Sequence, residues 1–434
     1  MARRLVPVFF FVGGLIWGGW AWWMDRRYTG AMAEIKAEIV AGRYAIACRN
    51  LKELLSWKAD PDGELVYNLG SCELARGREQ AADEAWARVV PGSAFLERAI
   101  RGRMRLCNKA GRLAAAERLV KAAAEDPRND RTALLVLLVP MFGELGRVDE
   151  AEWLIEDRWE HLNALGEGAL EPAIQLLRLH IDLTRKAAPV ETIRTVLEQA
   201  ARRAPDDDRV WLGRANLAIR AGAYDEAGRW LDACLMRLPD DVPVWRARLN
   251  WGVATDRIEV VKLCMTHLPA AEFRPAELHR LNAWLASKRG DIERERRALK
   301  RLLVTDPADP TAVDRLAQLA QNVGQPEEAA ELCRKKCDIE RLRARYEELH
   351  ERKQPFRDAV EMAHLAEQLG REFEARAFLT VAISEDPERE ELRYDLGRMS
   401  SRSSATIAAR RPTLADVLAH ELGNERKVDV IPPR

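Results

Sequence analysis

Apolar and polar residues alternate with the period of an amphipathic helix along most of this chain, and short turn sequences interrupt the pattern. Residues 208–239 hold two such segments, separated by a Gly-Ala-Tyr turn at 222–224 and closed by Pro239. The residues that share the apolar face within each segment are Trp211, Ala215, Ala227, Leu231 and Cys234. Spacings of three and four residues predict two packed helices, and proline ends the second because it cannot continue a helix.

The predicted turns recur with a nearly constant step from residue 31 to about residue 400. They lie at Gly42, Gly77, Gly111, Gly146, Ala188, Gly222, Asp256, Gly290, Gly324 and Gly370. Successive steps are 35, 34, 35, 42, 34, 34, 34, 34 and 46 residues. A helix pair with one apolar face buries that face by stacking on its neighbours, so a fixed period predicts a stacked helical array.

Each second helix carries a small residue five positions after its turn and a bulky apolar residue four positions later. The small residues are Ala47, Ala82, Ala116, Ala151, Ala227, Ala329 and Ala375. The bulky residues are Leu51, Trp86, Val120, Ile155, Leu231, Leu299 and Leu379. Val261 and Glu295 replace the small residue in their units, and Pro205, Pro239, Pro307 and Pro387 are expected to end second helices.

These positions resemble the tetratricopeptide repeat (TPR), a helix-turn-helix of 34 residues, at its small, bulky and proline places. Residues 66–70 show the same pattern in the second unit. The resemblance implies an all-α, right-handed TPR-type solenoid of about ten repeats over residues 31–400, with a general role in protein binding. The two long steps indicate insertions, one around 159–168 and one after Cys333, where a charged run is expected to lengthen the helices.

Residues 5–24, which begin with Leu5 and end with Met24, contain no charged side chain. A helix of this length is about 30 Å long at 1.5 Å per residue, which matches the hydrocarbon core of a membrane. Tryptophans crowd its C-terminal half, as in an interfacial aromatic belt. We therefore expect an uncleaved transmembrane helix after a short tail at 1–4. The alternative is a signal peptide cleaved at 31–33, but the apolar run is longer than such peptides usually have.

Arginines flank this predicted span on both sides, so the positive-inside rule does not orient it. Large domains cross membranes largely regardless of charge, and our expectation leans towards an exported, periplasmic body over a cytoplasmic one. Gly14 and Gly18 form a G-x-x-x-G pair that would bring two spans together in a homo-oligomer. The alternative is that these glycines are merely tolerated in a membrane helix.

The C-terminal region has a different pattern from the repeats. A capping helix is expected at 390–399, a flexible basic linker at 401–411, and a short amphipathic helix with a tail at 412–434. The apolar face of that last helix comprises Leu414, Val417, Leu418 and Leu422. It would dock either on the solenoid or on another protein, and the sequence favours neither.

Composition narrows the range of functions. Lys and Arg together number 69, and so do Asp and Glu, so we expect no nucleic-acid partner. Seven cysteines, an odd number, do not indicate a disulfide framework, and most are interpreted as core residues, including Cys72, Cys107, Cys234, Cys264 and Cys333. The chain has no phosphate-binding glycine loop and no paired C-x-x-C motifs, so we expect no cofactor, no metal and no catalysis. Cys333 and Cys337 could share a helix face, which leaves a metal- or thiol-dependent activity there as the least favoured hypothesis.

In the TPR family the first helices of successive repeats line a concave groove that takes peptides or extended segments. The resemblance places on that face Arg209, Asn216, Arg220, Arg246, Asn250, Arg280, Trp284, Lys288 and Gln318, with Glu277 and Asp314 as acidic neighbours. Four of these recur every 34 residues: Asn216, Asn250, Trp284 and Gln318. Leu212 stands where the chaperone-binding members of the family have a clamp lysine.

The strip is basic, and arginine donates to carboxylates in pairs while asparagine bonds an extended backbone. The favoured hypothesis is therefore a membrane-anchored, non-catalytic adaptor that holds an acidic or extended segment of a protein partner. The alternatives are that these are ordinary solvated residues, and that the chain is a structural solenoid that associates with itself.

Overall fold

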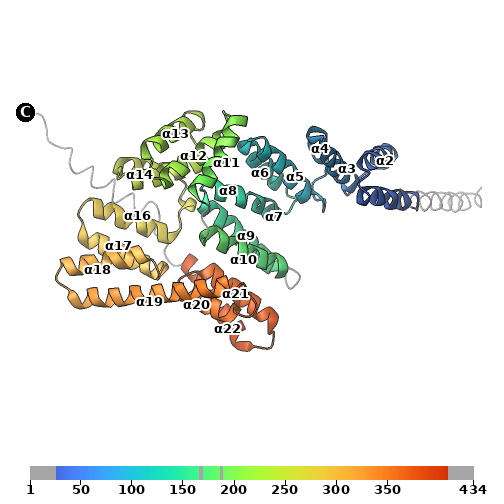
Figure 1. Cartoon of the computed structure of the whole chain (residues 1–434). Helices are drawn as coiled ribbons and strands as arrows, with labels where there is room; N and C mark the ends of the chain where they lie inside the picture. The colour runs from blue at the N-terminus through green and yellow to red at the C-terminus, as the bar shows by residue number, and fades with distance from the viewer. Residues whose placement is uncertain (1–25, 166–169, 186–188, 409–434) are drawn as a thin grey trace, which may run out of the picture. The chain divides into compact units, whose positions relative to one another are not determined.

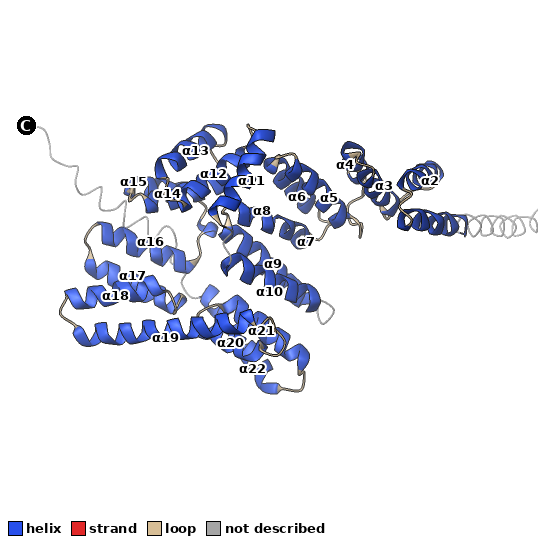
Figure 2. Cartoon of the chain, in the orientation of Figure 1, coloured by secondary structure: helices blue, strands red, loops and turns tan. Residues whose placement is uncertain are grey.

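The computed structural model describes residues 26–165, 170–185 and 189–408 (Figure 1). Every regular element within these ranges is a helix, which confirms the all-α prediction there (Figure 2). None of the described helices is both long and apolar enough to cross a membrane. The predicted span at 5–24, with Gly14 and Gly18, and the predicted amphipathic helix after Pro412 lie outside the described residues.

The chain divides into two compact units. Unit 1 comprises Met1–Met141 and Thr195–Val210, and unit 2 comprises Phe142–Arg194 and Trp211–Arg434. The predicted array at 31–400 therefore runs through both units, and its right-handed course stays a prediction.

Unit 1 begins with a helix whose described part covers 26–40. Its further helices are α2 (Tyr44–Trp57), α3 (Glu64–Ala75), α4 (Glu79–Trp86), α5 (Leu96–Lys109), α6 (Leu113–Glu125), α7 (Arg131–Leu135) and the 3-10 helix η2 (Val136–Leu138). Its first core cluster joins the 26–40 helix to α2, α3 and α4 through residues such as Ile35, Leu51, Leu65 and Ala85. Burying these side chains stabilises the stack because none of the helices covers its own apolar face.

Unit 2 contains the remaining helices. They are α9 (Val148–Leu165), α10 (Leu170–Arg185), α13 (Tyr224–Arg237), α14 (Val242–Ala254), α15 (Ile258–His267), α16 (Pro275–Lys288), α17 (Ile292–Thr305), α18 (Pro310–Asn322), α19 (Pro326–Glu351), α20 (Ala359–Gln368), α21 (Glu372–Glu385) and α22 (Glu390–Ala408), with a 3-10 turn at Ala270–Glu272. Three helices, α8 (Val139–Glu144), α11 (Val190–Arg203) and α12 (Asp208–Arg220), contribute residues to both units.

Each core cluster of unit 2 joins a helix pair to the first helix of the next pair. One cluster contains Leu212, Leu231 and Trp251, from α12, α13 and α14. The next contains side chains from α14, α15 and α16, and a third contains side chains from α16, α17 and α18. A helix pair thus completes its core only with its successor, which is the nearest-neighbour packing of a repeat array.

The backbone confirms the predicted turns. Nine of the ten turn residues have a positive φ, from 57° at Asp256 to 76° at Gly77, and the tenth, Ala188, lies outside the described residues. This left-handed conformation suits glycine because glycine has no Cβ. Asp256 adopts it as well, since aspartate tolerates this region better than most residues.

The predicted contact positions are buried without exception. The seven alanines and the seven bulky residues named above are all buried in the core. Glu295 occupies a small-residue position and is buried as a charged side chain, because Arg315 donates to both of its carboxylate oxygens, at 2.6 and 3.1 Å. The second helices α11, α13, α17 and α21 each end two residues before the proline predicted to stop them.

Both predicted insertions appear as longer helices. α9 has 18 residues and α19 has 26 residues, against 14 in α13 and α17. At the C-terminus, α22 continues to Ala408, so the segment expected as a linker from 401 starts as helix, in keeping with its alanines.

The first insertion has a consequence that the repeat pattern does not predict. In unit 2, α10 packs against α21, some 200 residues later in the chain (Figure 1). The Trp159 ring meets the Phe373 ring edge-on, with centroids 5.5 Å apart, and Arg376 pairs with Glu160 at 2.6 Å. The pair α9–α10 therefore ties the last repeats to the middle of the chain in a way that a simple one-dimensional array lacks.

Candidate binding surfaces

The predicted groove residues of unit 2 occupy equivalent places on their helices. α12, α14 and α18 begin at 208, 242 and 310, and position 276 of α16 continues that series, so residues 34 apart share one register. We call Asn216, Arg220, Arg246, Asn250, Arg280, Trp284, Lys288 and Gln318 the predicted strip. Arg209 belongs to unit 1 and is treated with that unit.

Arg246 is committed to an ion pair inside unit 2. Its guanidinium donates to the Glu277 carboxylate and to the Glu272 carbonyl oxygen, and it lies 4.9 Å from the centre of the Phe273 ring. Only 12% of its side chain is exposed. Burial raises the pKa of Glu277, and the Arg246 charge opposes this rise. The arginine therefore stabilises a buried acid from the next first helix.

The other two cations of α16 are also paired. Arg280 donates to Asp309 at 2.8 Å and lies 3.4 Å from Asp306, while Lys288 lies 2.6 Å from Asp256. Burial, followed by the neighbouring Asp309 charge, raises the pKa of Asp306, and Arg280 opposes this effect. A ligand carboxylate would have to compete with these partners.

Arg209 follows the same rule within unit 1. Its Nε donates to Glu117 at 2.7 Å, and 11% of its side chain is exposed. Arg220 differs, because it is exposed on α12 and has no ion pair within the described ranges. Four of the five predicted cations therefore neutralise carboxylates of this chain, and the predicted basic character of the strip is largely cancelled.

The polar row is partly open. The Asn216 amide donates to the Leu145 carbonyl oxygen at 2.8 Å and packs on Gly146, so this side chain supports the turn before α9. Asn250 and Gln318 are exposed, although Gln318 accepts from Arg315 at 3.3 Å. Trp284 packs half-buried against the core of α14–α16. The accessible parts of the row are thus two amides and the face of one indole.

A basic surface that sequence reasoning missed lies on α5 in unit 1. Arg98, Arg101, Arg105 and Lys109 follow one another at spacings of three, four and four residues and are all exposed. The core side of the same helix consists of Leu96, Ala99, Ile100 and Met104. The signal was available as helical spacing in LERAIRGRMRLCNK, but the more regular repeats after residue 208 drew attention away from it.

The described residues offer little for catalysis. They contain no cluster of three His, Cys, Asp or Glu side chains placed to hold a metal ion. Cys333 and Cys337 are exposed on α19, which corrects the interpretation of Cys333 as a core residue; this part of α19 extends past the helices that would cover it. Cys72, Cys234 and Cys264 are buried as predicted, and burial raises the pKa of Cys264 to about 12.

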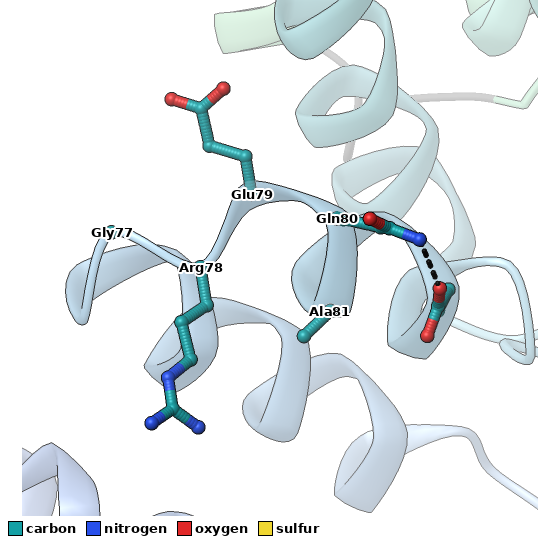
Figure 3. A pocket seen from close by; sticks show the side chains of 6 residues that line it. Gly77, Arg78, Glu79, Gln80 and Ala81 are labelled. Carbon is teal, nitrogen blue, oxygen red and sulfur yellow. Dashed lines mark hydrogen bonds between the residues drawn. The ribbon is translucent and has the colours of Figure 1, made fainter.

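A shallow hollow lies at the start of α4, lined by residues 77–81 and Glu84 (Figure 3). Its lining comes from one turn and the helix that follows it. Gln80 donates to Glu84 at 3.0 Å across this surface. With no groups converging from other helices, the hollow is not a candidate ligand site.

Comparison with known proteins agrees with the repeat pattern over one segment. Residues 191–249, which span α11 to the middle of α14, match a family model described as tetratricopeptide repeat. No curated protein matches the chain.

Several solved structures resemble the chain at low identity. Cut9–Hcn1, an APC/C hetero-tetramer, is 10% identical, with a TM-score of 0.33 over 89% of this chain and 94% of that chain. PilW, a type IV pilus biogenesis factor, is 18% identical, with a TM-score of 0.30 over 53% of this chain and 100% of that chain. A tetratricopeptide repeat protein from Parabacteroides merdae is 16% identical, with a TM-score of 0.27 over 60% of this chain and 100% of that chain.

Proposed function

We propose that this chain is a non-catalytic scaffold that binds an extended segment of a partner protein along the first helices of unit 2. The observation that carries the proposal is the repeated register of α12, α14, α16 and α18, within which residues 191–249 match tetratricopeptide repeats. Such repeats present equivalent side chains at equal intervals, and an extended segment can meet them one after another.

The contact chemistry follows from what is open on the strip. The amides of Asn250 and Gln318 can each donate to a carbonyl and accept from an N–H, which suits the backbone of an extended segment. Trp284 offers an apolar face for one side chain between them. Arg246, Arg280 and Lys288 hold carboxylates of neighbouring repeats, so in this proposal they position the first helices and do not bind the ligand.

The anchor is the second part of the proposal. Residues 5–24 would hold the scaffold at a membrane as a single-pass helix, with the body on the periplasmic side. Confining a bound partner to the membrane surface raises its effective concentration without any new contact. Self-association through Gly14 and Gly18 is compatible with this arrangement and is the competing use of the span.

Co-purification tests the scaffold. Tagged full-length chain is solubilised from membranes beside a variant carrying Asn250→Ala, Trp284→Ala and Gln318→Ala. A matched control carries Met236→Ala and Val304→Ala, which remove exposed side chains of second helices, each 83% exposed. We expect one partner to be recovered with the wild type and the control and lost with the strip variant. Equal recovery in all three would refute the strip as the binding site.

Two further readouts separate the alternatives. Extraction of membranes at alkaline pH should leave the full chain in the pellet and release a chain that lacks residues 5–24; release of both would refute the anchor. Light scattering of the solubilised chain reports its mass. A self-associating solenoid keeps its oligomeric state in the strip variant while recovering no partner in any sample.

A further inference from the structure

We propose that the exposed face of α5 in unit 1 is a separate docking surface for an extended acidic segment of a partner protein, with an apolar residue at one end. The α5 face consists of Arg98, Arg101, Arg105 and Lys109, together with Arg112 just after the helix. The proposal rests on the scaffold role above, but it concerns other residues, so the two can fail independently.

The α5 face is a continuous cationic surface. Its five side chains are all exposed and recur at helical spacing, on the side opposite the buried Met104. Arg203 adds a further guanidinium at the C-terminal end, where it donates to the Lys109 carbonyl oxygen at 2.6 Å. Arg103 lies towards the core side of the helix and pairs with Asp83 at 2.8 Å.

The cations of this face are incompletely neutralised. Arg101 pairs with Glu97 at 2.5 Å, and Lys109 pairs with Glu79. Arg98, Arg105 and Arg112 have no ion pair within the described parts of the chain. Five cations against two carboxylates leave an excess positive charge in a chain whose charges balance as a whole.

The following helices explain why these cations stay open. In unit 2, the carboxylates that pair with first-helix arginines come from the next repeat, as Glu277 does for Arg246, 31 residues later. The corresponding stretch after α5, residues 131–143, reads RTALLVLLVPMFG and contains no acidic residue. Its apolar side chains are used in the core, including Leu134 and Leu138. The acid that would neutralise the α5 face must therefore come from another molecule.

An aromatic pair marks one end of this face. Phe95 immediately precedes α5, one helical turn before Arg98, and its ring centroid lies 5.4 Å from that of Tyr67. Both side chains are half-buried, so each presents part of a ring to solvent. A single apolar side chain of a ligand can rest there while acidic residues continue along the cations.

The length of the face determines the spacing of the ligand. Arg98 and Lys109 are 11 residues apart, which is about 16 Å along a helix. Side chains on one side of an extended segment recur about every 6.8 Å. Three acidic residues at alternate positions therefore span about 14 Å and meet the arginines along the face.

The surface favours a peptide over other polyanions. Single-stranded nucleic acid is held by several stacking platforms, and the α5 face has one aromatic pair, at its end. A lipid surface would be attracted by the charge alone and would make no use of the half-buried Phe95 and Tyr67 rings. Charge together with a terminal apolar contact is what an acidic peptide with one aromatic residue can satisfy.

Fluorescence anisotropy tests the proposal on the full chain in detergent. The probe is a labelled peptide with one phenylalanine followed by three glutamates at alternate positions, separated by serines. We expect binding that weakens as salt rises, because exposed charges are screened. Arg98→Gln with Arg105→Gln should weaken it about tenfold. The control Arg118→Gln with Arg229→Gln removes two equally exposed arginines elsewhere and should leave it unchanged.

A charge swap makes the test specific. Arg98→Glu with Arg105→Glu should lose the acidic probe and gain a probe in which lysines replace the glutamates. If the arginine variants and the control weaken binding equally, or if the acidic probe does not bind, the proposal is wrong. Variant-sensitive binding to phosphatidylserine vesicles or to oligothymidylate without peptide binding would also overturn it. A partner that is still lost with the Asn250/Trp284/Gln318 variant would then leave the scaffold role standing.

Discussion

The first helices of the two units carry similar numbers of cations and use them differently. In unit 2, Arg246, Arg280 and Lys288 each contact a carboxylate of the same unit. In unit 1, Arg98 and Arg105 on α5 contact none within the described residues. The composition of a helix face therefore does not tell whether its charges are available. What decides it is whether the next repeat supplies an acid, and the apolar stretch 131–143 supplies none.

The contact between α9–α10 and α21 is a second difference, and breaking it should have the largest effect. Trp159→Ala removes a fully buried indole from its contact with Phe373. We expect unit 2 to lose about 3–5 kcal/mol of unfolding free energy, as large-to-small core substitutions do. Hydrogen exchange of peptides from each unit measures this. Unchanged protection in α21, or equal losses in both units, would contradict the interpretation.

Removing one partner of a closed pair should have the next largest effect. Arg246→Ala leaves Glu277 with a carboxylate whose charged form burial already disfavours, so we expect a loss of about 1–3 kcal/mol of unfolding free energy. Urea unfolding of Arg246→Ala, Glu277→Ala and the double variant measures the coupling. The double variant should lose less than the sum of the two single variants; strict additivity would mean that the pair does not interact.

Acid should weaken unit 2 partly through Glu374. Burial disfavours its charged form, but the neighbouring His180, the Arg371 charge and a hydrogen bond from Tyr346 at 2.5 Å outweigh this, so its pKa lies below the ordinary value of 4.5. A lowered pKa in the folded state means that this stabilisation is present above about pH 4.5 and is lost as the pH falls through the folded-state pKa.

Glu374→Gln removes the titrating group, so the stability of unit 2 should fall less steeply between about pH 5 and pH 3 than in the wild type. Hydrogen exchange at several pH values, compared for peptides of α21 and of α3, provides the readout. Glu73 in α3 of unit 1 also has a lowered pKa, because Lys52, Arg76 and Arg78 outweigh its burial, and it serves as an internal control. The same slope in both proteins for α21 would exclude a contribution from Glu374.

The smallest effect is expected on α5. Arg98→Ala and Arg105→Ala remove exposed side chains without an ion pair, so unfolding free energy should change by no more than about 0.5 kcal/mol. Urea unfolding provides the value. A loss as large as that of Arg246→Ala would show that these arginines serve the fold, and the contrast between the two units would disappear.

Much of the fold could be predicted because it depends on local chemistry. A positive φ at Gly222 and Gly290, and even at Asp256, follows from the tight turn that joins two antiparallel helices. The burial of Ala227 and Leu231 follows from their spacing on one helix face. The contact of α10 with α21 was not predictable in this way, because no periodicity relates Trp159 to Phe373.

The candidate site was predictable only as a set of positions. Asn250 and Gln318 are exposed, as their place in the period indicates. Asn216 occupies the same place, but it supports the Leu145 carbonyl because α8 and α9 meet α12 there. The α5 face could have been found from spacing alone, yet its open charges follow from the absence of acids in the helices after it.

By itself the sequence determined the helix pairs, their turns, their period and the residues that face their cores, since each depends on side chains a few positions apart. The tertiary structure alone decided which charges were neutralised, which polar side chains supported a neighbouring turn, and that α9–α10 would pack on α21. Those outcomes depend on residues 30 to 200 positions away. The energy of a charge or an amide is set by whatever the fold brings next to it, and a local pattern does not contain that neighbour.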